Sequence, residues 1–138
     1  MAERVSVVTD LAPIAEGPCS QAIKIGNYIF VSAQLPQDPQ SGEIVGSDMA
    51  AQTKKCLENL TGIFSALGGQ LSNIVKTTIY LTRITDLEAM DEAYKPYFAF
   101  LPPARTVVEV SGLPHGALVA IDAIAHLTKA EVQGGLLF

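Results

Sequence analysis

Arg105 has the clearest capacity for binding chemistry, because this cation follows two prolines at the start of a strand-like segment. Pro102 disfavours helical geometry in the residue before it, so an extended strand can begin here. A guanidinium at a strand entrance can hold a carboxylate through two parallel hydrogen bonds, since its planar fork matches the carboxylate. The alternative is an exposed arginine in a surface ion pair, the commoner situation for this residue type.

The chain has two cysteines and two histidines, whose spacing bears on nucleophilic and metal chemistry. Cys19 stands in a Gly-Pro loop, where a nucleophilic thiol would need a base beside it. Cys56 falls on the apolar stripe of a predicted helix and is expected to be a small core residue. His115 and His126 lack metal-ligand spacing, so a turn residue and a strand-end residue are the simpler interpretations. We expect free thiols and no metal site.

Alternating apolar residues in the first third of the chain predict three short strands, at residues 4–8, 22–25 and 28–32. A Gly-Asn pair between the second and the third strand is a two-residue turn signal, which predicts a hairpin. The segments 16–21 and 33–44 are rich in turn-forming residues, so we expect irregular connections there.

Two helices follow from the apolar periodicity of the middle of the chain. Ser47 is the predicted N-cap of the first helix, and the glycine pair 68–69 is its predicted end. A capping box at residues 85–88 predicts the start of the second helix. Pro96 should break the last turn of that helix.

The β-branched segment 74–81 has the composition of a central strand. Two further strand-like runs, 105–110 and 118–127, flank a turn at 111–116, and a hairpin is the simplest interpretation. The resulting order places both helices on a single face of a mixed sheet. We therefore predict an α+β fold in one domain that spans residues 1–138.

Composition predicts self-association and argues against nucleic acid as a partner. Hydrophobic residues make up 49% of the chain and charged residues only 17%. Since the strand 74–81 carries apolar residues on both faces, the uncovered face of the sheet should pack on another subunit. The net charge of −5 disfavours binding to a phosphate backbone. No apolar run reaches membrane-spanning length. We expect a cytoplasmic protein, with the mitochondrion as the alternative.

Short motifs recur in order along nearly the whole chain. They are GPxSQ at 17–21, GNxIFVSxQLP at 26–36, GE at 42–43, Gln52, VKTT at 75–78, PAR at 103–105 and LP at 113–114. These motifs closely resemble the RidA family, also called YjgF or L-PSP. The resemblance implies a chorismate-mutase-like fold, a homotrimer with clefts between subunits, and no cofactor. It also implies hydrolysis of reactive enamines and imines, such as 2-aminoacrylate, to a small 2-keto acid and ammonia.

The resemblance assigns several residues to the cleft. Arg105 matches the family arginine that binds the substrate carboxylate, Ser32 matches a cleft serine, and Pro114 falls where the family lines the site. Two other positions depart from the family pattern. Cys19 stands where deaminases usually have a tyrosine, and Asp91 stands where asparagine is frequent.

Three positions near the end of the chain bear on the chemical step. Val107 replaces a cysteine found in many members, and Ala120 replaces the glutamate thought to position the attacking water. Asp122 lies on the same strand face as Ala120, roughly 6.6 Å along by strand rise. It is either a substitute catalytic acid or a structural hydrogen-bond acceptor.

Two classes of function remain open from the sequence. The first is a deaminase of imino acids whose cleft is altered at Cys19, Val107 and Ala120. The second is a non-catalytic module that keeps Arg105 to bind a carboxylate ligand. Ribonuclease activity is also attributed to relatives, and the acidic charge makes RNA the weakest choice.

Overall fold

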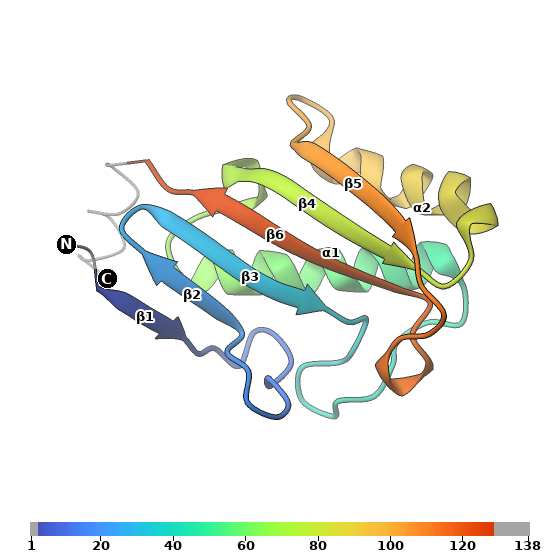
Figure 1. Cartoon of the computed structure of the whole chain (residues 1–138), viewed down its shortest axis with the longest axis horizontal. Helices are drawn as coiled ribbons and strands as arrows, with labels where there is room; N and C mark the ends of the chain where they lie inside the picture. The colour runs from blue at the N-terminus through green and yellow to red at the C-terminus, as the bar shows by residue number, and fades with distance from the viewer. Residues whose placement is uncertain (1–2, 129–138) are drawn as a thin grey trace.

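A computed structural model describes residues 3–128 as one six-stranded mixed sheet with two α-helices against one face (Figure 1). The strand order is β1-β2-β3-β6-β4-β5. The strands are β1 Arg4–Val7, β2 Ala22–Ile25, β3 Tyr28–Gln34, β4 Ile74–Leu81, β5 Ala104–Glu109 and β6 Val119–His126. The helices are α1 Met49–Ala66 and α2 Leu87–Tyr94, with short 3₁₀ turns at Leu71–Asn73, Ile84–Asp86, Lys95–Phe98 and Pro114–Gly116. The predicted α+β class is confirmed.

The predicted C-terminal hairpin is wrong. β5 pairs in parallel with β4 at the edge of the sheet, whereas β6 lies antiparallel between β3 and β4. β6 is the more apolar of the two strands and takes the buried central position, and the exposed β5 takes the edge. Turn residues after β5 predict that the chain reverses, but they do not specify which strand the returning segment joins.

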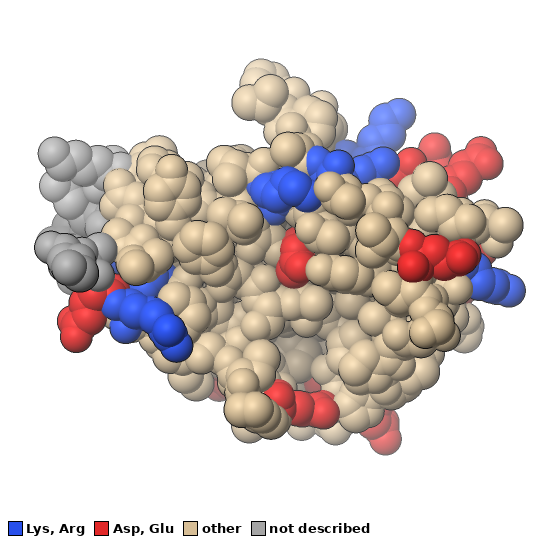
Figure 2. Space-filling view, in the orientation of Figure 1, with Lys and Arg blue, Asp and Glu red and all other residues tan. Residues whose placement is uncertain are grey.

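The two faces of the sheet have different compositions. Core residues such as Ile79, Leu81 and Ile121 face the helices and are fully buried. The other face, which we call the open face, is largely uncharged (Figure 2). Its apolar area includes the half-exposed Tyr28 and Phe30 of β3. Away from the core, β4 has a mixed surface: Lys76, Thr78 and Tyr80 lie opposite Ile124, Asp122 and Ala120, and Val75 is half-exposed.

The helix boundaries differ slightly from those predicted. Asp48, and not Ser47, caps α1, because its side chain accepts a hydrogen bond from the Ala51 amide. Gly68 follows the end of α1 with a φ of 75°, a left-handed conformation that favours glycine. The predicted capping box at 85–88 is not formed, and a 3₁₀ turn precedes α2 instead. The break at Pro96 is confirmed, since residues Lys95–Phe98 form a 3₁₀ helix.

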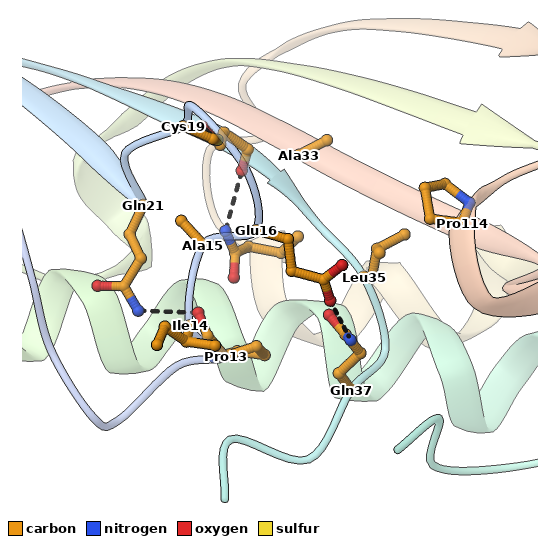
Figure 3. Close-up of a pocket in the computed structure, with 12 residues that line it drawn as sticks. Pro13, Ile14, Ala15, Glu16, Cys19, Gln21, Ala33, Leu35, Gln37 and Pro114 are labelled. Carbon is orange, nitrogen blue, oxygen red and sulfur yellow. Dashed lines mark hydrogen bonds between the residues drawn. The ribbon is translucent and has the colours of Figure 1, made fainter. Parts of the chain in front are cut away.

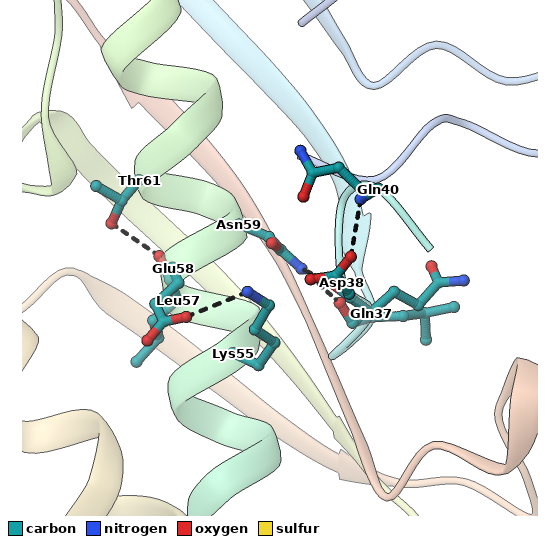
Figure 4. A network of polar contacts seen from close by, with 9 residues as sticks. Gln37, Asp38, Gln40, Lys55, Leu57, Glu58, Asn59 and Thr61 are labelled. Carbon is teal, nitrogen blue, oxygen red and sulfur yellow. Dashed lines mark hydrogen bonds and ion pairs between the residues drawn. The ribbon is translucent and has the colours of Figure 1, made fainter. Parts of the chain in front are cut away.

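Asn59 on α1 fastens the connection that follows β3 (Figure 4). Its buried side-chain amide donates to the carbonyl oxygens of Leu35 and Gln37, both at 3.0 Å. An irregular segment leaves backbone carbonyls without strand or helix partners, and a buried unpaired group is costly. The amide of Asn59 therefore fixes residues 35–37 against the helix.

Gly62 on α1 allows the segment near Leu11 to approach the helix closely. A Cβ atom added at Gly62 would lie 2.2 Å from the Leu11 carbonyl oxygen. We predict that Gly62→Ala lowers the free energy of unfolding by about 1–3 kcal/mol, in spite of alanine's better helix propensity. Denaturant unfolding at a fixed protein concentration measures this change.

Gly112→Ala is the matched control, because an added Cβ there meets nothing within 4 Å. The control should change the unfolding free energy by less than about 0.5 kcal/mol. Equal stability of both variants and the parent protein would contradict the close packing of Leu11 on α1.

Candidate functional site

A first pocket lies beyond the end of β3, between the 13–21 loop and the segment that precedes β6 (Figures 2 and 3). Its volume is about 240 Å³. The lining residues are Pro13, Ile14, Ala15, Glu16, Cys19, Gln21, Ser32, Ala33, Gln34, Leu35, Gln37 and Pro114. Three of the residues assigned from the sequence, Cys19, Ser32 and Pro114, therefore share one cavity.

Buried glutamine side chains hold the walls of this pocket. The Gln21 amide donates to the carbonyl oxygens of Thr9, Ala12 and Pro13, and its Oε1 accepts from the Thr9 amide at 2.7 Å. Figure 3 shows Gln21 bonded across to the loop that carries Ile14 and Ala15. Because one side chain satisfies four backbone groups, the loop keeps a defined shape without regular secondary structure.

Glu16 is the charged group within this pocket. Its carboxylate accepts from His115 Nε2 at 2.8 and 3.1 Å and from the Gln37 amide at 3.3 Å. The hydrogen bond from His115, with a second from Gln37, holds the pKa of the Glu16 carboxyl below its usual value. His115 has a φ of 61°, which is rare for a residue with a side chain. The contact between Glu16 and His115 thus joins the 13–21 loop to the 114–116 turn.

Cys19 and Ser32 lie together in the pocket, with their Sγ and Oγ atoms 3.4 Å apart. The Ser32 hydroxyl donates to the Ser20 carbonyl at 2.7 Å, which leaves its oxygen able to accept a hydrogen bond from a ligand. The Cys19 thiol contacts this hydroxyl and the Ser20 carbonyl. Neither partner is a base, so the contacts do not include the group that would activate a nucleophilic thiol.

Ala120 and Asp122 both face the open side of the sheet, but only Ala120 lines a cavity with Pro114. The carboxylate of Asp122 accepts from the Tyr80 hydroxyl at 2.8 Å and from the Thr78 amide at 3.2 Å. The hydrogen bond to Asp122 raises the pKa of Tyr80, so its hydroxyl keeps its proton at neutral pH. These contacts are those of a structural acceptor, the alternative left open by the sequence.

Arg105 lies in a different pocket, of about 400 Å³, which also includes Asp91, Tyr94 and Pro102. Arg105 on β5 pairs with Thr77 on β4, and its side chain projects on the helix side of the sheet. Its Nη1 donates to Asp91 Oδ1 at 2.5 Å, and its guanidinium carbon lies 5.3 Å from the centre of the Tyr94 ring. Arg105 therefore has the acidic partner that the sequence did not reveal.

The guanidinium is held and yet keeps binding capacity. Its side chain is 32% exposed, and the bond to Asp91 uses one of its five N–H donors. The Tyr94 hydroxyl is 2.9 Å from the Thr77 hydroxyl, which fixes the ring beneath the arginine. Val107, two residues along β5, is half-buried and packs against the hydrophobic core beside Ile79.

The assigned residues fall into two groups in one chain. Cys19, Ser32, Pro114 and Ala120 line cavities at the end of β3, whereas Asp91 and Arg105 line the pocket between β5 and α2. Within residues 3–128, no cluster of three or more histidine, cysteine or acidic side chains could hold a metal ion. No α-helix in this described range is long and apolar enough to cross a membrane.

Residues 9–127 match the family described as Endoribonuclease L-PSP. The match covers most of the chain, and the chain belongs to this family, which is the RidA family recognised from its motifs. A RutC family protein of Pyrococcus abyssi is 47% identical over 126 residues, which cover 91% of this chain and 98% of that protein.

One human relative and one solved structure extend the comparison. The Homo sapiens protein named 2-iminobutanoate/2-iminopropanoate deaminase is 40% identical over 119 residues, covering 86% of this chain and 87% of that protein. The crystal structure of RidA from the Antarctic bacterium Psychrobacter has a TM-score of 0.85 and 36% identity. The match covers 89% of this chain and 99% of the Psychrobacter chain. The predicted RidA-like fold is confirmed.

Sequence reasoning missed Glu16, Gln37 and the pairing partner of Glu16, His115. The sequence does contain a glutamate directly before the Gly-Pro pair, and it has glutamines in both predicted irregular segments, 16–21 and 33–44. Glu16 and His115 are separated by 99 positions, however, and a hydrogen bond at that separation leaves no local pattern.

Proposed function

We propose that this protein hydrolyses reactive 2-imino acids and their enamine forms, of the 2-aminoacrylate type, to 2-keto acids and ammonia. The observation that carries the proposal is the Arg105 guanidinium, which Asp91 and Tyr94 hold in place. Among residues 3–128, only Asp91 accepts a hydrogen bond from its side chain, so most of its donors are left for a ligand. A positioned, partly exposed arginine binds a carboxylate in two-point fashion. The name of the human relative supports imine deamination as the reaction.

The site is proposed to form between subunits of a homotrimer. One subunit would contribute Arg105 and Asp91, and its neighbour would contribute Cys19, Ser32, Pro114 and Ala120, because each group lines a separate pocket in a single chain. The apolar area on the open face, including Tyr28 and Phe30, supports association of this kind.

The hydrolysis needs few functional groups from the protein. Arg105 would hold the substrate carboxylate, and the Ser32 oxygen would accept a hydrogen bond from the imine nitrogen. Water then adds to the imine carbon to give a carbinolamine, whose collapse releases ammonia and leaves the 2-keto acid. Since Ala120 offers no group to orient the water, we expect turnover that is weak or altered in comparison with glutamate-bearing relatives.

Val107 and Asp122 are given smaller parts in this proposal. Val107 would support β5 from the core and keep Arg105 in place. The sequence offered Asp122 either a catalytic or a structural role, and its bonds to Tyr80 and Thr78 support the structural one.

The second candidate function is a non-catalytic module that binds a small carboxylate ligand. The observation in its favour is that Ala120 is apolar and that the nearby Asp122 carboxylate is already engaged by two donors. The net charge of −5 continues to disfavour RNA as a ligand. Accelerated release of keto acid from 2-aminoacrylate generated in a coupled assay distinguishes the deaminase from the binding module.

Arg105→Ala should weaken binding of small 2-keto acids by at least about tenfold, because charge-assisted hydrogen bonds to the carboxylate are lost. Titration calorimetry with 2-oxobutanoate measures the effect. Arg83→Ala is the matched control, because Arg83 is an exposed arginine that also pairs with an aspartate, Asp86. Unchanged affinity in Arg105→Ala would place the carboxylate site elsewhere.

Sedimentation equilibrium should give the mass of a trimer at micromolar concentration. The physical reason is the apolar area of the open face, which an isolated subunit would leave in water. A single species with the mass of one chain, 14.6 kDa, would refute the intersubunit cleft.

Ala120→Glu should raise the turnover of 2-aminoacrylate by on the order of 10²-fold or more, the contribution of a general acid or base. Cys19→Tyr combined with Ala120→Glu should exceed either single change, because an aromatic ring would narrow the cleft around the substrate. Asp122→Asn serves as the comparison. Full activity in the parent protein that Asp122→Asn leaves undiminished would show that water needs no carboxylate here.

A further inference from the structure

Ala120 lines a second cavity that is almost entirely apolar. The lining residues are Ala33, Leu35, Tyr80, Leu113, Pro114 and Ala120, and the volume is about 240 Å³. Within this set, Tyr80 has the only polar side-chain atom. We call this cavity the apolar compartment.

The apolar compartment adjoins the pocket of Cys19 and Ser32. Ala33, Leu35 and Pro114 line both cavities, so these three residues form a shared wall. The shared residues place the compartment next to Ser32. Figure 3 shows Leu35 and Pro114 on the side of the pocket away from Gln21.

The small side chain of Ala120 keeps the compartment open. Ala120 on β6 lies directly opposite Tyr80 on β4. The Tyr80 hydroxyl donates to Asp122, two residues farther along β6. This bond holds the Tyr80 ring in place, and the ring lines the compartment together with Ala120. A longer side chain at position 120 would project from the strand into this space.

The chemistry of the walls restricts what the compartment receives. A charged or strongly polar group would lose its hydration there without gaining partners. A hydrocarbon group gains instead, by about fourfold in affinity for each methylene group that it buries. The volume of about 240 Å³ exceeds the approximately 30 Å³ share of one water several times, which is room for a branched side chain of about four carbons.

We propose that the apolar compartment binds the substrate side chain, and that the protein acts on 2-imino acids with branched or extended aliphatic side chains. This inference rests on the proposed function, and it names the substrate class of the same site. The single methylene carbon of 2-aminoacrylate would leave the compartment mostly empty. Ala120, opposite Tyr80, is then the residue that determines specificity.

Calorimetry with a series of 2-keto acids, the stable products, tests the preference. The full-length protein should bind 4-methyl-2-oxopentanoate at least about tenfold more tightly than pyruvate, because three additional carbons are buried. The corresponding imines, generated in place from leucine and alanine by an amino acid oxidase, should show the same order in kcat/KM. Equal or reversed order in both measurements overturns the inference.

Variants of the compartment make the test specific. Ala120→Val should weaken binding of 4-methyl-2-oxopentanoate by a larger factor than binding of pyruvate, so that the preference between the two ligands falls. Ala89→Val is the matched control, since Ala89 is exposed on α2 and does not line the compartment. Leu113 is a half-buried loop residue that lines the compartment, so Leu113→Ala should shift the preference toward longer side chains. This variant replaces Ala120→Val as the test if the valine variant does not fold. An unchanged preference in Leu113→Ala and in any folded Ala120→Val overturns the inference.

Failure of the inference differs from failure of the proposed function. If pyruvate and the longer keto acids bind equally, and Arg105→Ala weakens both, the carboxylate site stands and the side-chain compartment is refuted. If no keto acid binds and no imine is hydrolysed faster than it decays spontaneously, both the proposed function and the inference fall.

Discussion

The central burial of β6 is the constraint on which the rest of this structure depends. β6 pairs with β3 on one side and β4 on the other, and its core-facing residues, such as Ile121, are fully buried beneath α1. Since strand side chains alternate between faces, the same placement turns Ala120 and Asp122 to the open face. Ala120, which lines a cavity with Pro114 and Tyr80, is therefore held in place by the packing of its neighbours on β6.

The loops at the end of β3 are shaped by side-chain amides. Gln21 binds the 9–13 segment, Asn59 binds residues 35–37, and Gln52 accepts from the Leu118 amide just before β6. An irregular segment must satisfy its backbone groups somewhere, and these buried amides do so without strand or helix pairing. This arrangement lets the pocket walls be loops and still keep a fixed geometry.

Arg105 illustrates how a group with a proposed binding role can be structural as well. The Asp91 carboxylate and the Tyr94 ring come from α2, so they tie the edge strand β5 to the helix layer through the guanidinium. The same contacts orient the remaining donors, which reduces the freedom that a ligand would have to restrict. The surface ion pair and the carboxylate anchor, the two alternatives drawn from the sequence, are thus compatible.

The sequence by itself determined the local elements and the family. Apolar periodicity predicted both helices and placed the strands within one or two residues, because periodicity reports which face of an element is buried. Cys56 was predicted as a core residue and is fully buried. The break at Pro96 followed from the missing amide proton and fixed φ of proline. The motifs around Arg105 and Ser32 carried the RidA resemblance.

Only the tertiary structure decided which elements meet. Three contacts join residues that are far apart or on different elements: the parallel pairing of β5 with β4, the contact of Arg105 with Asp91, and the hydrogen bond between Glu16 and His115. Local secondary-structure propensity does not encode these contacts, because the arrangement of the elements depends on how much apolar area each arrangement buries. The division of the candidate site into two groups within one chain likewise follows from sheet order, which is set by the burial of β6 at the centre and β5 at the edge.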